Sequence, residues 1–386
     1  MDFSPFNTLP QETLHQIFSH LPLRQIAAAK CVCKALRSAL SSPPFLHLLR
    51  SQCQNHPVHV LALKPSHRHV SAHPTFHAFD PQSNQWLRFS LSFLPFSSLH
   101  PITSARGLLY LWASTQNPQN TPAQSSQKAL VVCNPLTSQF KTLPQLGSAW
   151  SRHGSVLSGS LNVVLVLTEL AILYYSEDGN PKDEDLNLNP SVLDNWLKFS
   201  SNLPSKPRSP ILISDSVLTL CDVGSPWRSQ WAMFKTKIVD MDKAMQWVRL
   251  EKHEWGDIFD VLKRPRLVKA GNDQKVYMVG GLKGSYALQS ACTTILILRL
   301  DLESLEWEEA GRMPMEMYRC FVESSKFKVF GGGNRVCFSA KRVGRLALWE
   351  ENGDGKTKWR WVDGVPGGGD GLCRGFTFEA RLDAIP

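Results

Sequence analysis

The feature that most constrains this chain is an apolar, helix-forming stretch near the amino terminus, framed by Leu9-Pro10 and Leu21-Pro22. Large apolar residues within it recur at the i, i+3, i+4, i+7 spacing that places side chains on one helix face. They are Leu14, Ile17, Phe18 and Leu21. A proline fits the first turn of a helix, where its missing amide would have no partner, and the second proline ends the segment. The stretch therefore predicts an amphipathic helix between the two prolines.

Two more short helices are predicted to follow. The segment from Leu23 to Leu40 carries a second apolar seam, formed by Ile26, Ala29, Cys33, Leu36 and Leu40. Residues 41–49 begin with two serines, which suit an N-cap, and continue into a short apolar helix. About fifty residues is near the lower limit for an independent hydrophobic core. We therefore expect another part of the chain, or another protein, to cover some of the apolar surface of these helices.

The order of these elements resembles the F-box family, whose pattern combines two Leu-Pro pairs, an acidic residue, apolar helix positions and a Val-Cys-Lys-x-Trp-Arg-like element. The matching elements are Leu9-Pro10, Glu12, Leu14, Ile17-Phe18, Leu21-Pro22 and residues 32–37. Leu36 stands at the usual tryptophan position, so that part of the interface should be smaller than average. The resemblance implies that the module docks on a Skp-type adaptor and, through it, on a cullin scaffold of a ubiquitin ligase.

Recognition of a helix in a groove uses anchors at this helical spacing, so the physical pattern agrees with the resemblance. The residues we expect to contact the adaptor are Leu9, Pro10, Leu14, Ile17, Phe18, Leu21, Pro22, Ile26, Val32, Cys33 and Lys34. The sequence does not separate those that face the adaptor from those that pack the helices together. The alternative is an amphipathic terminal helix that only packs on a larger core of this chain.

Composition favours a globular chain that works in a reducing compartment. Of 386 residues, 42% are hydrophobic and 19% are charged, and the nine cysteines are scattered without a C-x-x-C pair. No apolar run approaches the length of a membrane span, and no signal peptide is apparent. We expect a nuclear and/or cytoplasmic protein without a membrane partner. The net charge of +9 suits an acidic adaptor or target. Nucleic acid is a less suitable partner, because the sequence contains no Lys/Arg block with interleaved aromatic residues.

Beyond the first domain, aromatic residues recur every 51–60 positions. They are Trp86, Phe140, Trp196, Trp247, Trp307 and Trp361. Three of them end closely similar turn segments, namely 80–86, 134–140 and 301–307. A period near fifty residues is typical of kelch-type propellers, in which each repeat is one four-stranded blade. The series predicts an all-β kelch-like propeller, most simply with six blades, although five or seven blades, a sandwich or two smaller β domains are alternatives.

Glycine pairs and the last apolar strand give a second mark of the propeller. Gly280-Gly281 and Gly331-Gly332 each end an apolar strand, as in kelch repeats, and residues 375–380 could close the ring beside an N-terminal strand. These features resemble plant F-box/kelch proteins of the Skp-interacting-partner type. The predicted organisation is a small all-α three-helix F-box domain at 1–50, a connector at 51–74 and the propeller at 75–386.

Candidate chemistry is sparse. Six histidines crowd residues 56–77, at His56, His59, His67, His69, His73 and His77, but neither cysteine nor carboxylate supports them as metal ligands, and a solvated connector is the better interpretation. No catalytic arrangement can be justified, and no cofactor is expected. The resemblance implies a non-catalytic receptor that brings a target protein to the ligase. A propeller enzyme of the metal-oxidase type and a scaffold propeller without a ligase role are the alternatives.

Overall fold

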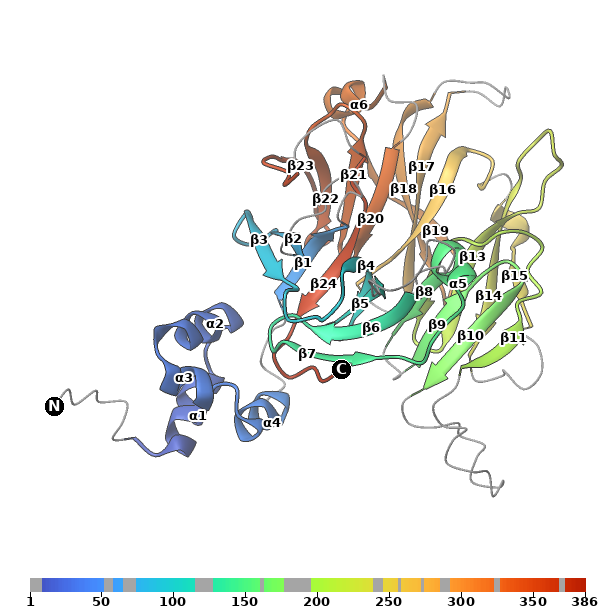
Figure 1. The fold of residues 1–386 in the computed structure, drawn as a ribbon. Coiled ribbons are helices and arrows are strands. Elements are labelled where there is room, and N and C mark those ends of the chain that lie inside the picture. Colours follow the sequence, from blue (N-terminus) through green and yellow to red (C-terminus); the bar gives the residue numbers. More distant parts are fainter. Residues whose placement is uncertain are drawn as a thin grey trace.

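The computed structural model describes residues 9–51, 58–64, 74–114, 128–159, 163–176, 196–238, 246–255, 258–271, 274–284, 292–322, 327–367 and 372–386. Its helices at the amino end project from the rim of a six-sheet propeller (Figure 1). The helices are α1 (Gln11–Ser19), α2 (Leu23–Val32), α3 (Lys34–Ala39) and α4 (Pro43–Ser51). The predicted single helix from Leu23 to Leu40 is wrong, because Cys33 adopts an extended conformation (φ −153°, ψ 164°) that separates α2 from α3.

The described part of the propeller contains six sheets, each of four antiparallel strands. Blade 1 has the order β24 (Gly375–Ala380), β1 (Val58–Leu63), β2 (Thr75–Asp80), β3 (Gln85–Ser90). Blade 2 comprises β4 (Ser98–Ala105), β5 (Leu108–Ser114), β6 (Lys128–Asn134) and β7 (Gln139–Thr142). Blade 3 comprises β8 (Ser155–Ser158), β9 (Val163–Leu167), β10 (Ala171–Ser176) and β11 (Leu197–Ser200).

The other three blades follow the same plan. Blade 4 comprises β12 (Arg208–Ile213), β13 (Ser216–Asp222), β14 (Trp231–Lys237) and β15 (Val248–Leu250). Blade 5 comprises β16 (Leu262–Lys269), β17 (Lys275–Lys283), β18 (Cys292–Asp301) and β19 (Trp307–Arg312). Blade 6 comprises β20 (Phe327–Gly332), β21 (Arg335–Ala340), β22 (Leu346–Glu351) and β23 (Thr357–Val362). Short helices α5 (Ser148–His153), η4 (His253–Trp255) and α6 (Met315–Val322) lie between blades.

The ring closes by pairing the two ends of the propeller sequence. Strand β24 is the innermost strand of blade 1 and pairs with β1 from Val58↔Ala380 to Leu63↔Gly375. The innermost strands of successive blades contact one another around the ring, and β24 contacts both β4 and β20. This closure removes the exposed sheet edges that an open array would have. The predicted role of residues 375–380 is therefore confirmed, whereas the predicted connector at 51–74 is wrong, because β1 already belongs to the propeller.

The aromatic period marks the outermost strand of each blade. Phe140, Trp86, Trp307 and Trp361 lie in β7, β3, β19 and β23, and the two remaining tryptophans directly precede β11 and β15. Three of the indole nitrogens donate to a backbone carbonyl just past the outer strand of the preceding blade. These bonds are Trp86 to Asp363 (2.8 Å), Trp196 to Pro144 (2.9 Å) and Trp247 to Ser201 (2.5 Å). At these three positions the aromatic residue joins neighbouring blades. The Trp307 Nε1 is buried without a hydrogen-bond partner among the described residues, so the bond is not common to all six blades.

The repeated turn segments have a common structure. In each, an Asp or Asn at the end of the third strand accepts a backbone N–H two residues on, at 2.9–3.0 Å. The acceptors are Asp80, Asn134 and Asp301. Four residues after each acceptor the chain adopts a positive φ, at Asn84, Ser138 and Leu305, and the aromatic follows two residues later. Side-chain capping of the turn and the left-handed residue together turn the chain into the outer strand.

The glycine pairs do not occupy equivalent places. Gly280-Gly281 lies in β17, the second strand of blade 5, whereas Gly331-Gly332 ends β20, the innermost strand of blade 6. The two glycine pairs are therefore not a repeat of structure. The period of the aromatics located the blades, and the glycines did not.

Candidate functional site

The candidate site is the surface of the four helices, whose shared core separates buried residues from exposed ones. The core of this helical domain contains Leu14, Phe18, Ile26, Leu36, Leu40, Phe45 and Leu49, with Leu21 packed against it. Three of the predicted adaptor-contacting residues, Leu14, Phe18 and Ile26, therefore hold the helices together instead of forming the surface. Leu36, which stands at the usual tryptophan position, is also buried here. The sequence suggested that this leucine would make the adaptor interface smaller, but the residue instead belongs to the core of the helical domain.

Seven of the eleven predicted residues are exposed: Leu9, Pro10, Ile17, Pro22, Val32, Cys33 and Lys34. Leu9, Ile17 and Val32 expose 41%, 50% and 73% of their area, which is a high share for large apolar side chains. The Cys33 side chain also accepts a hydrogen bond from the Leu36 amide (3.4 Å) and so caps α3.

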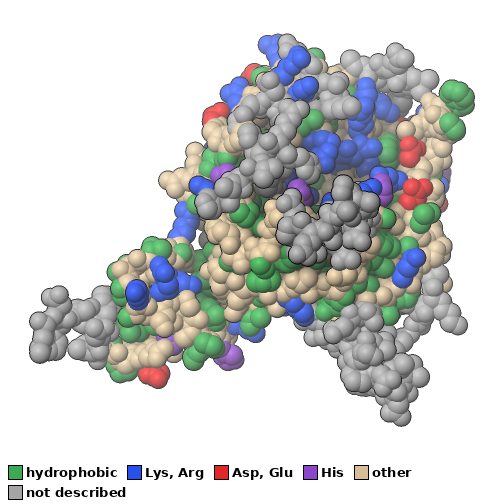
Figure 2. Space-filling model, viewed as in Figure 1, with side chains coloured by type: hydrophobic (Ala, Val, Ile, Leu, Met, Phe, Trp, Pro, Cys, Tyr) green, Lys and Arg blue, Asp and Glu red, His purple; other side chains and the backbone are tan. Residues whose placement is uncertain are grey.

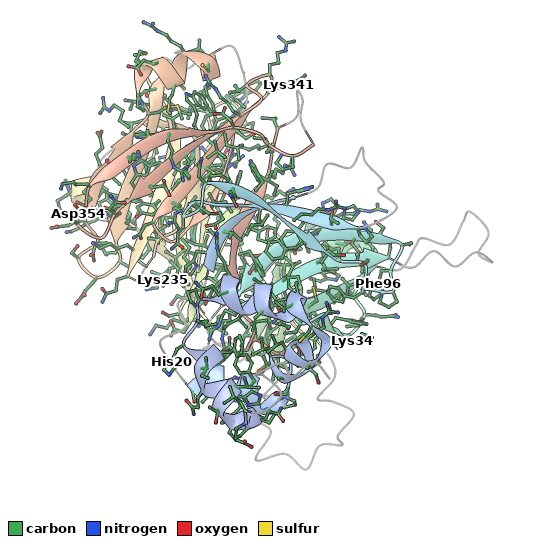
Figure 3. All side chains as sticks on the ribbon, turned by 90° about the vertical axis from the view of Figure 1, so that its left-hand side faces the viewer. His20, Lys34, Phe96, Lys235, Lys341 and Asp354 are labelled. Carbon is green, nitrogen blue, oxygen red and sulfur yellow. The ribbon has the colours of Figure 1, made fainter. Side chains whose placement is uncertain are left out.

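The exposed residues lie in two parts. One part is carried by α1 and its flanking prolines, and the other is the corner between α2 and α3. Figure 3 shows His20, which directly follows α1, and Lys34, which begins α3, at opposite edges of the helical domain. A partner that contacts both parts must therefore extend across the domain.

The corner between α2 and α3 is positively charged. Lys34 and Arg37 are exposed, and the Arg37 Nε donates to the Lys30 carbonyl (3.2 Å). Partial burial and the nearby Arg37 charge lower the pKa of Lys30. Basic side chains are visible on the helical domain in Figure 2. The corner therefore suits a partner surface that carries acidic residues.

Sequence reasoning missed the residues that attach the helices to the propeller. Leu382, which follows β24, is buried in the core of the helical domain. The Arg50 Nη2, at the end of α4, donates to the Asp383 carbonyl (2.8 Å), and Arg24 of α2 pairs with the buried carboxylate of Asp80. Asn134 Nδ2 donates to the carbonyls of Arg381 (2.9 Å) and Ala384 (2.8 Å). No helical or β-strand period marks these contacts, because they join segments that are distant in sequence.

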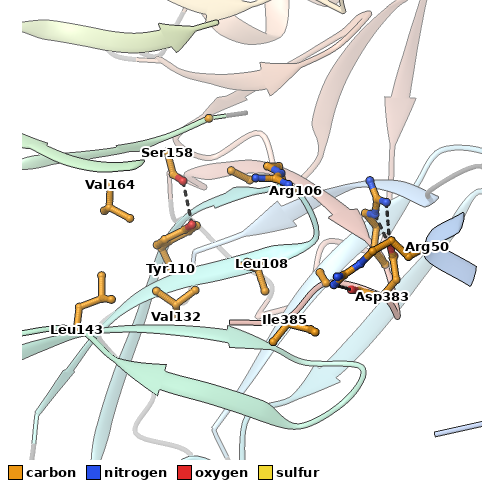
Figure 4. A pocket seen from close by; sticks show the side chains of 14 residues that line it. Arg50, Arg106, Leu108, Tyr110, Val132, Leu143, Ser158, Val164, Asp383 and Ile385 are labelled. Atoms are coloured by element: carbon orange, nitrogen blue, oxygen red, sulfur yellow. Dashed lines mark hydrogen bonds and ion pairs between the residues drawn. The ribbon is translucent and has the colours of Figure 1, made fainter. Parts of the chain in front are cut away.

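We call the region where the carboxyl-terminal residues 381–385 connect the helical domain to the propeller the joint. A cavity of about 310 Å³ lies there, between α4, the carboxyl-terminal residues and blades 2 and 3 (Figure 4). Its polar groups are already engaged with one another. The Ser158 hydroxyl donates to the Tyr110 hydroxyl (2.9 Å), and Arg381 pairs with Asp383 (2.8 Å) and Glu379 (3.2 Å). Although burial raises the pKa of Asp383, the hydrogen bonds and charge of Arg381 outweigh it and hold that pKa below its usual range. The cavity is therefore part of the joint.

Four of the six clustered histidines, His56, His67, His69 and His73, lie outside the described residues. His59 and His77 lie on β1 and β2, and burial lowers the pKa of both. Within the described ranges no group of three or more His, Cys, Asp or Glu side chains is arranged to hold a metal ion. Likewise, none of the described helices is long and apolar enough to cross a membrane.

The helical module and the six-bladed propeller together define an F-box protein with a propeller domain. An F-box-like family model matches residues 6–48. SKP1-interacting partner 15 of Arabidopsis thaliana is 55% identical over 398 aligned residues, which cover both chains completely. The chain therefore belongs to the family of SKP1-interacting partner 15, as the resemblance to plant Skp-interacting partners predicted.

Two more distant similarities were found. Protein UNUSUAL FLORAL ORGANS of Arabidopsis thaliana is 22% identical over 411 residues, which cover 99% of this chain and 86% of that protein. Among solved structures, TolB from Acinetobacter baumannii matches with a TM-score of 0.49 and 9% identity over 83% of this chain and 66% of its own.

Proposed function

We propose that this protein is the substrate-recognition subunit of a Skp-cullin-F-box ubiquitin ligase. The helical domain recruits a Skp-type adaptor, and the propeller holds a target protein near the transferring machinery. The observation that carries this proposal is the F-box module with exposed Leu9, Ile17 and Val32, joined to a closed propeller in one chain that is 55% identical to a SKP1-interacting partner.

The exposed apolar residues supply a reason for binding. A large apolar side chain contributes roughly 1.5–3 kcal/mol when a partner buries it, before the loss of freedom on association is subtracted. Ile17 on α1 and Val32 at the end of α2 are placed to be buried in this way. Lys34 and Arg37 would add charge complementarity to an acidic adaptor, which favours the correct orientation and a faster encounter.

In this proposal the protein does not catalyse a reaction; it supplies proximity and orientation. A metal-dependent propeller enzyme is the alternative, and metal analysis of the purified protein separates the two. Stoichiometric copper or zinc would favour the enzyme. We also propose that the protein acts in the nucleus and/or the cytoplasm, which fluorescent tagging of the full chain would test.

Adaptor binding is tested with the variant Ile17→Arg/Val32→Arg. Both side chains are exposed, so the helical domain should stay folded, whereas two buried arginine charges would oppose the interface. We expect capture of the purified Skp-type adaptor to fall by about a hundredfold or more, since an unpaired charge buried at an interface costs several kcal/mol. Leu21 is left unchanged, because it packs against the domain core.

The matched control is Leu170→Arg/Val248→Arg. These propeller residues are also aliphatic and exposed, at 82% and 62% of their area. Adaptor capture should be unchanged in this variant. Equal loss in both variants would point to a general effect of added arginine, and full capture by Ile17→Arg/Val32→Arg would contradict the proposed interface.

A further inference from the structure

Basic side chains converge at one mouth of the central channel. Arg208 begins β12 and Arg374 directly precedes β24, whereas Arg264 lies near the start of β16 and Arg266 near its middle. Lys64 follows β1 beside them, and its amide donates to the Arg374 carbonyl (2.8 Å). Because β12, β16 and β24 are the innermost strands of their blades and run in the same direction around the ring, their starts meet at the same face. We call these five residues the basic mouth.

The basic mouth lies at the face opposite the helical domain. Strand β24 begins next to Arg374 and ends at Ala380, and two residues later Leu382 enters the core of the helical domain. A strand of this length spans about 20 Å. Figure 2 shows Lys and Arg side chains gathered where the inner strands meet, away from the helical domain. A ligand at the basic mouth would therefore leave the adaptor-facing helices free.

The cations of the basic mouth are close enough to disfavour one another's charge. Burial, with the nearby charges of Arg266 and Arg264, lowers the pKa of Arg208 to about 10. Burial, Arg264 and Arg374 act in the same direction on the pKa of Arg266. Burial and the Arg374 charge bring the pKa of Lys64 to about 8. Like charges held together are unfavourable in the isolated protein and become favourable when an anion binds among them.

Arg208 still has capacity for a ligand. Its guanidinium lies over the Trp231 ring (4.6 Å), and its buried Nε has no hydrogen-bond partner among the residues that the structure describes. The charge of Asp222 reaches Arg208, but the Asp222 Oδ1 already accepts the amides of Gly224 (3.1 Å) and Gln230 (3.0 Å). A buried donor without a partner is uncommon in native proteins, and a bound anion would supply its acceptor.

Two neighbouring blades use the same backbone device at the basic mouth. Ser209 in β12 and Arg264 in β16 have φ near +50° and +55°, and each directly precedes a proline. The strand pairing shifts at the same point, between Arg208 and Ile211 and between Lys263 and Arg266. Non-glycine residues in this conformation are strained and cluster at binding sites. The two bulges therefore shape the mouth in the same way in blades 4 and 5.

We propose that the basic mouth, formed by Lys64, Arg208, Arg264, Arg266 and Arg374, binds an anionic segment of the target protein, a stretch of peptide with clustered carboxylate or phosphoryl groups. The proposal rests on the proposed receptor function and assigns the place and chemistry of target recognition. Carboxylate and phosphoryl oxygens both match the hydrogen-bonding geometry of arginine. Nucleic acid is less suitable, because the charges converge on one point and do not follow a path along which a phosphate backbone could run.

The test uses the full chain co-purified with its adaptor and measures fluorescence anisotropy with three labelled peptides. These are oligo-glutamate, the same peptide with phosphoserine replacing glutamate, and oligo-glutamine. We expect the two anionic peptides to bind, with affinity that falls as salt rises, and the glutamine peptide not to bind. The variant Arg266→Glu/Arg374→Glu should weaken binding by about tenfold or more, because two attractive charges become repulsive.

The matched control is Arg249→Glu/Lys356→Glu, which makes the same change of charge at exposed positions away from the basic mouth. This control should retain peptide binding. Equal weakening in both variants, equal binding of oligo-glutamine, or stronger binding of single-stranded DNA of matched charge would overturn the proposal. Competition by stoichiometric inorganic phosphate would also overturn it in favour of a small anion. Adaptor capture, read in the same samples, reports on the receptor function separately.

Discussion

The helical domain and the propeller complete their hydrophobic cores in different ways. The propeller closes on itself, because β24 at one end of its sequence pairs with β1 at the other. The helical domain does not close on itself, since Leu382 from beyond β24 lies among its core residues. One carboxyl-terminal segment therefore serves both: its strand closes the ring, and the residues after the strand fill the core of the helices.

This difference has a consequence for orientation. The Arg50 side chain of α4 binds the Asp383 carbonyl, and Asn134 of blade 2 in turn anchors this carboxyl-terminal segment through the carbonyls of Arg381 and Ala384. Gly107, with φ +83°, lies so close to Arg381 and Ala384 that an added Cβ would stand 2.7–2.8 Å from their Cβ atoms. A joint packed this closely fixes the angle between the adaptor-facing helices and the propeller. In a receptor, that angle would set the position of a target relative to the adaptor.

The largest predicted effect comes from two truncations, which separate the closure of the ring by β24 from the filling of the helical core by the residues after β24. Removing residues 375–386 deletes β24 and opens the ring, so we expect loss of cooperative folding or a melting temperature lower by about 10 °C or more. Removing only residues 382–386 keeps the strand, and the propeller should melt close to the full chain. In the shorter deletion, limited proteolysis should cut between Ser51 and Val58 faster, because the helices have lost Leu382.

Each truncation is the control for the other. The two roles would not be separable if the 382–386 deletion lowered the melting temperature of the propeller as much as the 375–386 deletion. Unchanged proteolysis in the 382–386 deletion would show that the pairing of Arg24 with Asp80 and the packing of Leu23 on the propeller core are sufficient to hold the helices.

How far the sequence predicts each region follows from the range of its interactions. Helix α1 was found from its apolar spacing and its prolines, because a helix depends on residues within a few positions of one another. The blades were found because an aromatic residue recurs in or just before the outer strand of each blade, where Trp86, Trp196 and Trp247 bond to the preceding blade. The break at Cys33 was missed, since the apolar seam runs on unchanged through it and only the backbone turns.

The joint and the first strand could not be found in this way. Val58–Leu63 is a short apolar run next to a histidine-rich segment, and only its pairing with β24, more than three hundred residues on, makes it part of the propeller. Which side chains of α1 are buried could not be predicted from the sequence for the same reason. Leu14 and Ile17 share one helical face in sequence terms, yet the position of α4 and Leu382 buries the first and leaves the second open. Contacts of that range carry no local period.

The middle-sized effect is expected from Leu382→Ala, which tests whether the helical domain needs this residue. Truncating a buried leucine typically costs about 2–5 kcal/mol, and here the cost should fall on the helices. Hydrogen exchange should become faster throughout α1 to α4, with the blades little changed. Leu170→Ala is the matched control, because Leu170 is exposed, and it should leave exchange as it was. Faster exchange in the blades alone would contradict the shared core.

The smallest predicted effect is a loss of stability at low pH, and it compares one carboxylate at the joint with one inside the propeller. Arg381 holds the pKa of Asp383 at the joint below its usual range despite burial, and Arg360 and Arg335 do the same for Glu350 inside blade 6. A carboxylate whose pKa is lower in the folded state stabilises that state above its unfolded pKa, about 4, and the contribution is lost as the pH falls through the folded pKa. For partly exposed pairs the amount should be below about 1 kcal/mol.

Asp383→Asn and Glu350→Gln remove these two contributions separately. At neutral pH, Asp383→Asn should speed proteolysis between α4 and β1, and Glu350→Gln should lower the melting temperature of the propeller. Both differences from the unaltered protein should shrink as the pH is brought from neutrality to below about 4, because the unaltered carboxylates then become protonated as well. A difference that stays constant with pH would mean that shape, and not charge, is what these side chains contribute. If Asp383→Asn instead changed the melting of the blades, the joint and the propeller would be one cooperative unit, and the distinction between the two cores would fail.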